Sequence, residues 1–454
     1  MTEQQKKDFR IINGNSLEIL DNFEPNSVDA IVTDPPYELG FMGKQWDASG
    51  IAYNVELWKK ALRVLKPGGY LLAFGGSRTF HRIACAIEDA GFEIRDTIMW
   101  LYGSGFPKSH NVGIDIDKLN GVESEIVGLK KQNGAKFKLT QELIDNGGFN
   151  DASRQEFEVK KANNEWNGWG TALKPAFEPI IMARKPIEDS VAKNVLKYGV
   201  GAINIDECRI DTTDIRGGGY ENREEGSKGT LGWVTQKKEF TGGRFPANVL
   251  HDGSDEVVKD MPNNKGTNPS ELGSYGFCFD EGQRDSKPMA HGYEDEGSVS
   301  RYFYCAKASK KDRDEGLGKD FDEKQNIFMA THNGTGTVSK GMERFATQPK
   351  KNFHPTVKPV ELMQYLVRLV SPRGATIVDI FNGSGTTGKA VAFENRERNC
   401  GYKYIGIELD PEYCKISESR IDYALNKYEY DVIEEKKENE KKGIIDLFDF
   451  DWGE

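Results

Sequence analysis

Short apolar strands alternate with amphipathic helices at both ends of the chain, and this alternation restricts the fold more than any other feature. In the N-terminal part, we expect helices at residues 54–65 and 77–90, and strands at 10–12, 28–33, 70–74 and 92–101. After residue 358, we expect strands at 375–380 and 404–407, and helices at 359–370, 386–393 and 411–425. Such alternation predicts an α/β fold with a largely parallel sheet covered by helices on both faces.

The middle of the chain lacks this alternation. Residues 102–350 hold 32 of the 49 glycines, and only 177–183 has strand character. This stretch is too long for an ordinary linker, so we interpret it as an inserted target-recognition region. The predicted organisation is a domain in two halves, 1–101 and 351–427, with an insertion at 102–350 that contains a returning core strand near 177–185, and an acidic tail at 428–454.

Charge and hydropathy limit the partners of the chain. The net charge is −11, but residues 429–454 carry 10 acidic and 4 basic side chains, so the rest of the chain is only mildly acidic. A nucleic acid would therefore have to be bound by local basic patches. No apolar run approaches the roughly 20 residues of a membrane span, and the N-terminus is polar. We expect a cytoplasmic protein with no membrane partner and, because the cysteines are scattered, no metal.

The tetrapeptide Asp34-Pro35-Pro36-Tyr37 directly follows the expected strand at 28–33. Ligands of α/β sheets bind at the carboxyl ends of strands, so this tetrapeptide should face a crevice. The prolines leave carbonyl groups free to accept hydrogen bonds, Asp34 adds an anionic acceptor, and Tyr37 adds a flat ring. These groups suit a planar ring that bears an amino group. An ordinary proline-rich turn is the alternative interpretation.

A second unit, residues 377–388, has the pattern of a strand, a tight glycine loop and a helix. Gly383 and Gly385 would let backbone N–H groups approach a bound cofactor closely. Glu408 follows the expected strand at 404–407, roughly 20 residues beyond the loop, where dinucleotide-binding folds place a ribose-binding carboxylate. This unit predicts a cofactor that contains adenosine.

The same loop also fits the nucleoside-triphosphate pattern GxxxxGK, which ends at Lys389. That pattern requires Ser or Thr next, for magnesium, and this chain has Ala390. Asp379, just before the loop, would also repel phosphates. We therefore disfavour a nucleoside triphosphatase.

Together these motifs resemble the amino-directed DNA methyltransferases that use S-adenosylmethionine. The early Asp-Pro-Pro-Tyr box and the late glycine loop follow the order of the β group of that family, and His354–Pro359 precedes the loop as in the family. Stretches 41–47, 172–179 and 302–308 look like its phage and mobile-element branch. The resemblance implies a Rossmann-like methyltransferase sheet with circularly permuted motif order. Two positions depart from the family pattern: Asn15 replaces Asp, and Ile380 replaces Pro.

The resemblance also implies the chemistry: direct, in-line methyl transfer to an exocyclic amine of a base flipped out of duplex DNA. The catalytic residues that it implies are Asp34, Pro35, Pro36 and Tyr37. For S-adenosylmethionine, it implies Asn15, Asp34, Thr356, Lys358, Asp379, Phe381, Asn382, Gly383, Ser384, Gly385, Thr386 and Glu408. Within that set, Thr356 and Lys358 would lie near the cofactor carboxylate, and Glu408 would bind the ribose hydroxyls.

Asp34 at the start of the box favours N6 of adenine, because family members that act on N4 of cytosine often carry Ser there. The long insertion favours duplex DNA as the substrate, since sequence readout needs additional surface. The alternatives are cytosine-N4 methylation, methylation of RNA or protein amides, and a catalytically silent DNA-binding protein with the same fold.

Several basic and aromatic side chains in or near the insertion are candidates for DNA contacts. They are Lys44, Lys130, Lys131, Lys136, Lys138, Trp166, Trp169, Lys307, Lys310, Lys311 and Arg313. Solvated surface is the alternative interpretation for each cluster. No catalytic role is needed for His81, His110, His251 and His354, and we expect them at the surface or at helix ends.

The acidic tail ends in an apolar cluster, residues 444–452. Its stretch 445–448 partly resembles peptides that bind the bacterial sliding clamp, although Ile444 replaces the usual leading Gln. Docking to a clamp and packing against the enzyme's own body are the two interpretations, and we favour packing. A homodimer and a cognate restriction enzyme are both left open by the sequence.

Overall fold

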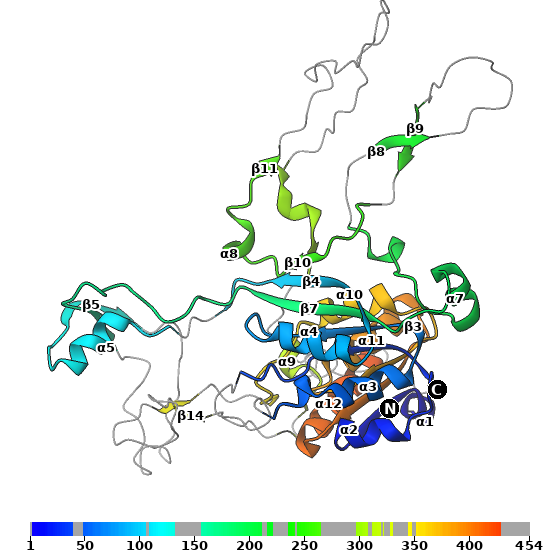
Figure 1. The fold of residues 1–454 in the computed structure, drawn as a ribbon, viewed down its shortest axis with the longest axis horizontal. Helices are drawn as coiled ribbons and strands as arrows, with labels where there is room; N and C mark the ends of the chain where they lie inside the picture. The colour runs from blue at the N-terminus through cyan, green and yellow to red at the C-terminus, as the bar shows by residue number, and fades with distance from the viewer. Residues whose placement is uncertain are drawn as a thin grey trace, which may run out of the picture.

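A nine-stranded sheet forms the centre of the molecule, in the order β1-β17-β16-β2-β3-β7-β4-β10-β13 (Figure 1). The computed structural model describes residues 2–39, 49–105, 109–131, 156–210, 216–220, 235–240, 243–264, 297–306, 311–318, 321, 327–329, 344–346 and 351–427. The strands of the sheet are β1 (Phe9–Asn13), β2 (Val28–Thr33), β3 (Leu65–Phe74), β4 (Glu93–Leu101), β7 (Phe177–Arg184), β10 (Val249–His251), β13 (Tyr304–Cys305), β16 (Thr376–Asp379) and β17 (Lys403–Glu408). Strand β7 is antiparallel to β3 and β4, and the other neighbouring pairs are parallel.

The two ends of the chain meet inside this sheet. Strands β16 and β17 lie between β1 and β2, with Ile377 paired to Ala30 and Phe9 paired to Tyr404. The carboxyl end of β2, which leads into Asp34, therefore lies beside the carboxyl end of β16. This arrangement brings the two sequence motifs to one edge of the sheet, as the parallel-sheet prediction requires.

Helices cover both faces of the sheet. One face carries α2 (Ser16–Ile19), α3 (Val55–Val64) and α4 (Phe80–Asp89), and the other carries α10 (Val360–Val370), α11 (Thr386–Arg398) and α12 (Pro411–Leu425). Successive side chains of β3 alternate between the two cores: Leu72 and Phe74 pack on the α10 side, and Leu71 and Ala73 pack on the α3 side. The predicted α/β architecture, with helices on both faces, is confirmed.

Residues of the insertion contribute more to this body than the sequence predicted. Strand β7 lies where one returning core strand was expected, but β10 and β13 also join the sheet. These two strands have only three and two residues, which is too short for a period-two hydrophobic pattern to be recognised.

The remaining elements lie mostly outside the central layers. They are α1 (Glu3–Asp8), α5 (Val112–Leu119), β5 (Glu125–Lys131), β6 (Glu156–Lys161), α7 (Val191–Tyr198), β8 (Arg216–Tyr220), β9 (Thr235–Phe240), α8 (Asp255–Val258), β11 (Asn263–Asn264), β12 (Gly297–Ser298), α9 (Lys311–Asp314), β14 (Ile327–Met329) and β15 (Arg344–Ala346). No helix in the described ranges has the length and apolar character needed to cross a membrane.

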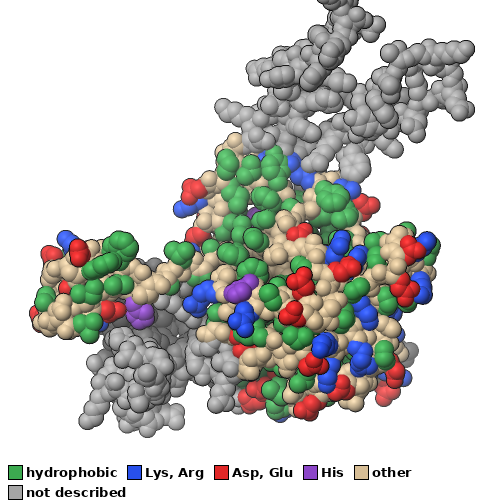
Figure 2. All heavy atoms as spheres, in the orientation of Figure 1, with side chains coloured by type: hydrophobic (Ala, Val, Ile, Leu, Met, Phe, Trp, Pro, Cys, Tyr) green, Lys and Arg blue, Asp and Glu red, His purple; other side chains and the backbone are tan. Residues whose placement is uncertain are grey.

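One group of these elements, α5 with the β5–β6 hairpin, projects from the body (Figure 1). Figure 2 shows apolar side chains on its surface. The exposed apolar side chains of this outlying module and the loop after it are Leu119, Val122, Ile126, Val127, Val159, Trp166, Trp169 and Leu173.

The end of the insertion is fastened to the C-terminal half by buried charges. Glu315, just after α9, accepts hydrogen bonds from Lys389 Nζ of α11 at 2.7 Å and from the Tyr423 hydroxyl of α12 at 2.9 Å. Arg420 Nη2 of α12 donates to the carbonyl of Asp312 at 2.8 Å. Both Lys389 and Arg420 have no exposed surface, so this docked segment, residues 311–317, seals two cations inside the protein.

Candidate active site

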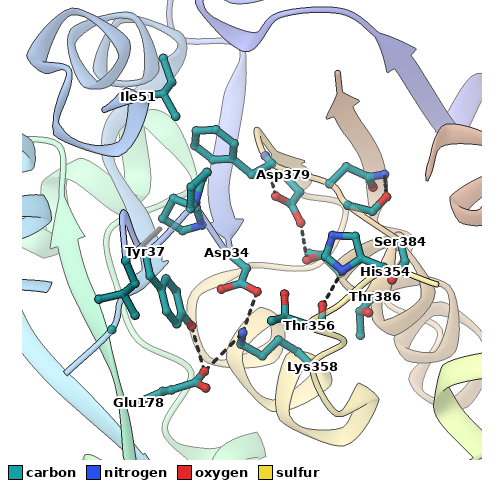
Figure 3. Close-up of a pocket in the computed structure, with 18 of the residues that line it drawn as sticks. Asp34, Tyr37, Ile51, Glu178, His354, Thr356, Lys358, Asp379, Ser384 and Thr386 are labelled. Atoms are coloured by element: carbon teal, nitrogen blue, oxygen red, sulfur yellow. Dashed lines mark hydrogen bonds and ion pairs between the residues drawn. The ribbon is translucent and has the colours of Figure 1, made fainter. Parts of the chain in front are cut away.

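A cavity of about 1660 Å³ opens at the carboxyl ends of the central strands (Figure 3). Its lining comes from the segment after β2, the glycine loop after β16, the segment before α10, the segment after β17, and the chain leading into β7. The structure thus brings most of the predicted catalytic and cofactor-binding positions into one cavity. We describe its two ends in turn: the acceptor end around Asp34, and the loop end around the glycine loop.

Asp34 occupies the acceptor end, directly after β2. One carboxylate oxygen, Oδ2, accepts a hydrogen bond from Lys358 Nζ at 2.6 Å. The other oxygen, Oδ1, is buried and has no hydrogen-bond partner among the described residues. A buried carboxylate oxygen without a partner is costly unless a ligand or water supplies a donor. Asp34 is therefore available to accept a hydrogen from a molecule in the cavity.

Tyr37 is held in a fixed orientation at the same end. Its hydroxyl donates to Glu178 Oε2 at 2.9 Å, and the Lys358 ammonium lies 5.3 Å from its ring centroid. Burial, with the charges of Asp34 and Glu178, raises the pKa of Tyr37 well above its usual value, so the hydroxyl stays protonated. Pro35 is buried and Pro36 half-buried between Asp34 and Tyr37, and both line the cavity.

Lys358 lies between two carboxylates. Its Nζ is 2.6 Å from Asp34 Oδ2 and 3.3 Å from Glu178 Oε2, and its side chain is 8% exposed. Burial lowers the pKa of Lys358, but Asp34 and Glu178 raise it by more, so the ammonium keeps its charge. The resemblance placed Lys358 near the cofactor carboxylate. In the structure, its ammonium pairs with two carboxylates at the acceptor end, and its contact with the cofactor stays a prediction.

The loop end is built on Asp379, the last residue of β16. Its carboxylate accepts hydrogen bonds from the hydroxyls of Thr33 at 2.7 Å and Thr387 at 2.6 Å, and from the N–H of Phe381 at 3.0 Å. Burial raises the pKa of Asp379 to about 6 against these hydrogen bonds. Both carboxylate oxygens of Asp379 accept hydrogen bonds from the protein, so this side chain braces the loop. The backbone of Asp379 remains the part that a cofactor could contact.

The glycine loop turns sharply because two glycines adopt left-handed backbone conformations. Gly383 has φ of +52°, and Gly385 has φ of +75° at the N-terminus of α11. A Cβ atom at Gly385 would lie 2.2 Å from Ser417 Oγ, so α12 leaves no room for a side chain there. The glycines therefore allow the loop to turn tightly against α12, and its close approach to a cofactor stays a prediction.

Other side chains of the loop point into the protein. The Asn382 Oδ1 atom accepts hydrogen bonds from the hydroxyls of Tyr404 at 2.8 Å and Ser417 at 3.3 Å. Arg420 Nη1 donates to both oxygens of Ser384 and, at 3.3 Å, to Thr386 Oγ1. These contacts hold the loop, and they leave its backbone as the ligand-facing part.

Glu408 ends β17 beside the loop. Its Oε2 accepts the Gly383 N–H at 2.6 Å and its Oε1 accepts the Asp410 N–H at 2.9 Å. Burial raises the pKa of Glu408. Each oxygen still has a second lone pair, so the predicted contact with ribose hydroxyls stays a prediction. Asn15 also lines the cavity, and its Oδ1 caps α2 by accepting the Leu17 N–H at 3.0 Å.

His354 was expected to be an ordinary surface or helix-end residue, and that expectation is wrong. It lines the cavity, and its ring packs edge-on against Tyr413 at a centroid distance of 4.7 Å. Its Nδ1 lies 2.7 Å from the carbonyl of Thr356, which fits an N–H donor at that nitrogen. Burial lowers the pKa of His354 to about 4, so the ring is neutral at pH 7.

Glu178 and Arg420 were also missed by the sequence analysis. Glu178 lies in the stretch 172–179 that resembles the family, and it directly precedes Pro179 in the expected strand. That resemblance is the signal that could have identified it. Arg420 gave no signal, because an arginine on an amphipathic helix is ordinarily solvated.

Lys389 decides against the nucleoside-triphosphatase interpretation. Its side chain is fully buried and pairs with Glu315 at 2.7 Å, so its ammonium is not available to phosphates in the cavity. Within the described residues, no group of three or more His, Cys, Asp or Glu side chains could hold a metal ion.

The predicted DNA contacts are described only in part. Trp166 and Trp169 lie beside the outlying module, with exposed rings 5.2 Å apart, and the chain after them lines the cavity from residue 171 onward. Arg313 Nη1 donates to the carbonyl of His354 at 2.6 Å, which gives it a structural contact. Lys130 and Lys131 lie in β5 and Lys311 begins α9. Outside the described residues lie Lys44, Lys136, Lys138, Lys307 and Lys310.

Comparisons with known proteins show the family of the chain. Residues 28–419 match the family N6_N4_Mtase, described as DNA methylase. The chain is similar to the type II methyltransferase M.HpaI of Haemophilus parainfluenzae, with 33% identity over 111 residues, which cover 22% of this chain and 34% of that protein. It is also similar to the DNA adenine methyltransferase YhdJ of Escherichia coli K12, with 42% identity over 71 residues, 16% of this chain and 22% of that protein.

Both matches span less than two thirds of the relatives' own lengths. Among solved structures, the M1.HpyAVI–SAM complex aligns with 91% of this chain and 99% of its own, at 14% identity and a TM-score of 0.33.

Proposed function

The chain belongs to the N6_N4_Mtase family of DNA methylases, and we propose that it transfers the methyl group of S-adenosylmethionine to the N6 amine of adenine at a specific site in duplex DNA. The observation that carries this proposal is Asp34 Oδ1, a buried anionic acceptor without a partner among the described residues, at the end of β2 beside Tyr37. An amine that is to be methylated needs such an acceptor, because its lone pair is otherwise delocalised into the ring.

In this proposal the cavity holds both the cofactor and the target base. At the loop end, the backbone of Asp379, Gly383 and Gly385 would hold the methionine part of the cofactor, and Glu408 would hold its ribose. Phe381 would pack on its adenine. When bound, S-adenosylmethionine supplies a methyl group that is already electrophilic, so the protein's task is alignment.

At the acceptor end, Asp34 Oδ1 would accept one hydrogen of the flipped base's amine, and the Pro35 carbonyl would accept the other. These two bonds draw the nitrogen toward a tetrahedral geometry and aim its lone pair at the methyl group. Tyr37 would stack on the base, and its bond to Glu178 fixes the ring before the base arrives. Asp34 or water takes the proton that the amine loses.

Adenine is proposed over cytosine because Asp34 opens the box, and the relative YhdJ is by name a DNA adenine methyltransferase. The proposed DNA surface includes the tryptophans beside the outlying module, since the chain that follows them enters the cavity. Duplex DNA is thus the proposed partner.

The test is incubation with labelled S-adenosylmethionine and unmodified duplex DNA, followed by nuclease digestion and mass spectrometry of the nucleosides. N6-methyladenine is the expected product. N4-methylcytosine would keep the site chemistry and overturn the choice of base. Cofactor binding with no methylated nucleoside would overturn the proposal and favour RNA, protein or a silent DNA-binding role.

A further inference from the structure

Glu178 contacts both Tyr37 and Lys358 at the acceptor end (Figure 3). Its Oε2 atom accepts the Tyr37 hydroxyl at 2.9 Å and lies 3.3 Å from Lys358 Nζ. Lys358 in turn is bound to Asp34 Oδ2 at 2.6 Å. The three side chains of this ion triad, Asp34, Lys358 and Glu178, are 21%, 8% and 19% exposed. They come from the end of β2, from the segment before α10 and from β7.

We propose that Glu178 is a positioning residue for methyl transfer: it shares the Lys358 ammonium with Asp34 and so keeps Asp34 Oδ1 a strong hydrogen-bond acceptor. The inference rests on the proposed function, because it concerns how Asp34 meets the target amine. In this arrangement, one cation is balanced against two carboxylates, and Asp34 Oδ1 is buried without a hydrogen-bond partner among the described residues.

The charge count explains why both partners of Asp34 matter. Without Lys358, two half-buried carboxylates would face one cavity with no cation between them, and one of them would take up a proton. A protonated Asp34 accepts the amine hydrogen poorly. Without the Glu178 charge, the ammonium would belong to Asp34 alone and would withdraw electron density from the oxygen that must accept. The triad therefore places one ammonium between two carboxylates and leaves Asp34 Oδ1 available to accept a hydrogen bond.

The geometry also permits the ammonium to stay paired during the reaction. If Asp34 takes the proton from the amine, an N–H bond breaks and an O–H bond forms on Asp34, and Lys358 remains protonated throughout. Glu178, already 3.3 Å from Nζ, then holds the ammonium alone. No other proton acceptor has to move.

A merely structural ion triad makes a different prediction from a functional one. Removing either partner of a buried ion pair destabilises a protein because a charge is left unpaired. Removing both Lys358 and the Glu178 charge leaves Asp34 without its ion-pair partner but also without a repelling carboxylate. If the triad acts on Asp34, the double change restores part of the activity that the loss of Lys358 removes.

The experiment compares wild type with Lys358→Met, Glu178→Gln and the double variant. Single-turnover methylation of duplex DNA is measured between pH 5 and pH 9, and cofactor affinity is measured by calorimetry. The charged and titratable groups that face Asp34 in the described structure are Lys358, Glu178, Tyr37, His354 and Asp379. The last three are unchanged in every variant, so differences between profiles report the triad.

We expect Lys358→Met to lower the rate at pH 7 by about a hundredfold and to move the acidic limb of the profile upward by about one pH unit. Glu178→Gln should lower the rate by about tenfold without an upward shift. The double variant should recover about tenfold of the rate lost in Lys358→Met, with its limb moved back down. Cofactor affinity should change less than about threefold in all variants.

A double variant no faster than Lys358→Met, with the same limb, overturns the inference. If Lys358→Met does not fold, Glu178→Asp replaces it: retained charge should restore the rate lost in Glu178→Gln, and equal rates for the two overturn the inference. Absence of any methylated nucleoside with wild type would instead overturn the proposed function itself, so the two failures are distinguishable.

Discussion

Both ends of the cavity present carboxylates, but the two ends differ in how many carboxylate oxygens the protein itself hydrogen-bonds. At the loop end, both oxygens of Asp379 and both oxygens of Glu408 accept hydrogen bonds from the protein. At the acceptor end, Asp34 has one oxygen in an ion pair and one buried oxygen without a partner in the described structure. A satisfied carboxylate stabilises the fold, whereas an unsatisfied one is maintained at a cost that a ligand can offset. The contrast distinguishes carboxylates that hold the glycine loop in place from the carboxylate that can accept a hydrogen from a substrate.

The sharpest way to break this comparison is to remove one carboxylate at each end. Asp34→Asn keeps the shape of the side chain and removes its charge, so methyl transfer should fall by about a thousandfold or more. Cofactor affinity should change little, and the loss of stability should be small because the Lys358 ammonium keeps Glu178 as an ion-pair partner. Single-turnover methylation, with calorimetry for the cofactor, measures both. Turnover near the wild-type rate would remove Asp34 from its role.

Asp379→Ala should act mainly on the fold and on the cofactor. The change removes three hydrogen bonds that join β16 to β2, the glycine loop and α11. We expect the free energy of unfolding to fall by about 3 kcal/mol and the cofactor affinity to fall more than tenfold. Urea unfolding and calorimetry check this. Normal cofactor binding by a stable Asp379→Ala protein would contradict the bracing role.

Two glycines with the same backbone angle give a matched pair. Gly385 and Gly50 both have φ of +75°, but a Cβ at Gly385 meets Ser417 Oγ at 2.2 Å, whereas a Cβ at Gly50 meets nothing within 4 Å. Gly50→Ala should cost about 1 kcal/mol of stability from backbone strain alone. Gly385→Ala should cost about 2 kcal/mol more from overpacking, and it should weaken cofactor binding. Equal losses in urea unfolding would show that α12 does not confine the loop.

The smallest effect concerns pH. Burial lowers the pKa of His354 from 6.5 to about 4, so between those values the unfolded chain binds a proton that the native ring does not. The neutral, buried His354 ring therefore costs no stability above pH 6.5, and the free energy of unfolding decreases as the pH falls from 6.5 toward 4. His354→Asn should therefore flatten the decline of unfolding free energy between pH 7 and pH 5 by about 1 kcal/mol. Urea unfolding of the wild type and of His354→Asn at several pH values checks this. Equal slopes of unfolding free energy against pH would contradict the assignment.

The fold was predictable where local pattern and tertiary burial agree. The apolar run at β2, the glycines after β16 and the helix at Pro411–Leu425 each carry a local signal that tertiary packing reinforces. Strands β10 and β13 were missed because they are short and are defined only by pairing, β10 with β4 and β13 with β10. Pairing over long sequence distances leaves no periodic trace.

The site was predictable for the functional residues that lie next to one another in short sequence motifs. Asp34 and Tyr37 stand in one tetrapeptide, and Gly383 and Gly385 stand in one loop. The role of Glu178 depends on a contact with Lys358 across 180 positions of sequence, and the neutral state of His354 depends on burial. Neither property can be read from neighbours in the chain.

The docked segment has a consequence for how such enzymes could exchange specificity. Recombination between relatives that replaced the whole of residues 102–350 would remove Glu315 and leave the Lys389 ammonium buried without a counter-charge. An orphaned buried charge of this kind costs about 3–5 kcal/mol, a large part of a domain's stability. Residues 311–317 therefore belong structurally to the body that carries the glycine loop, although they precede it by more than 60 positions in the chain.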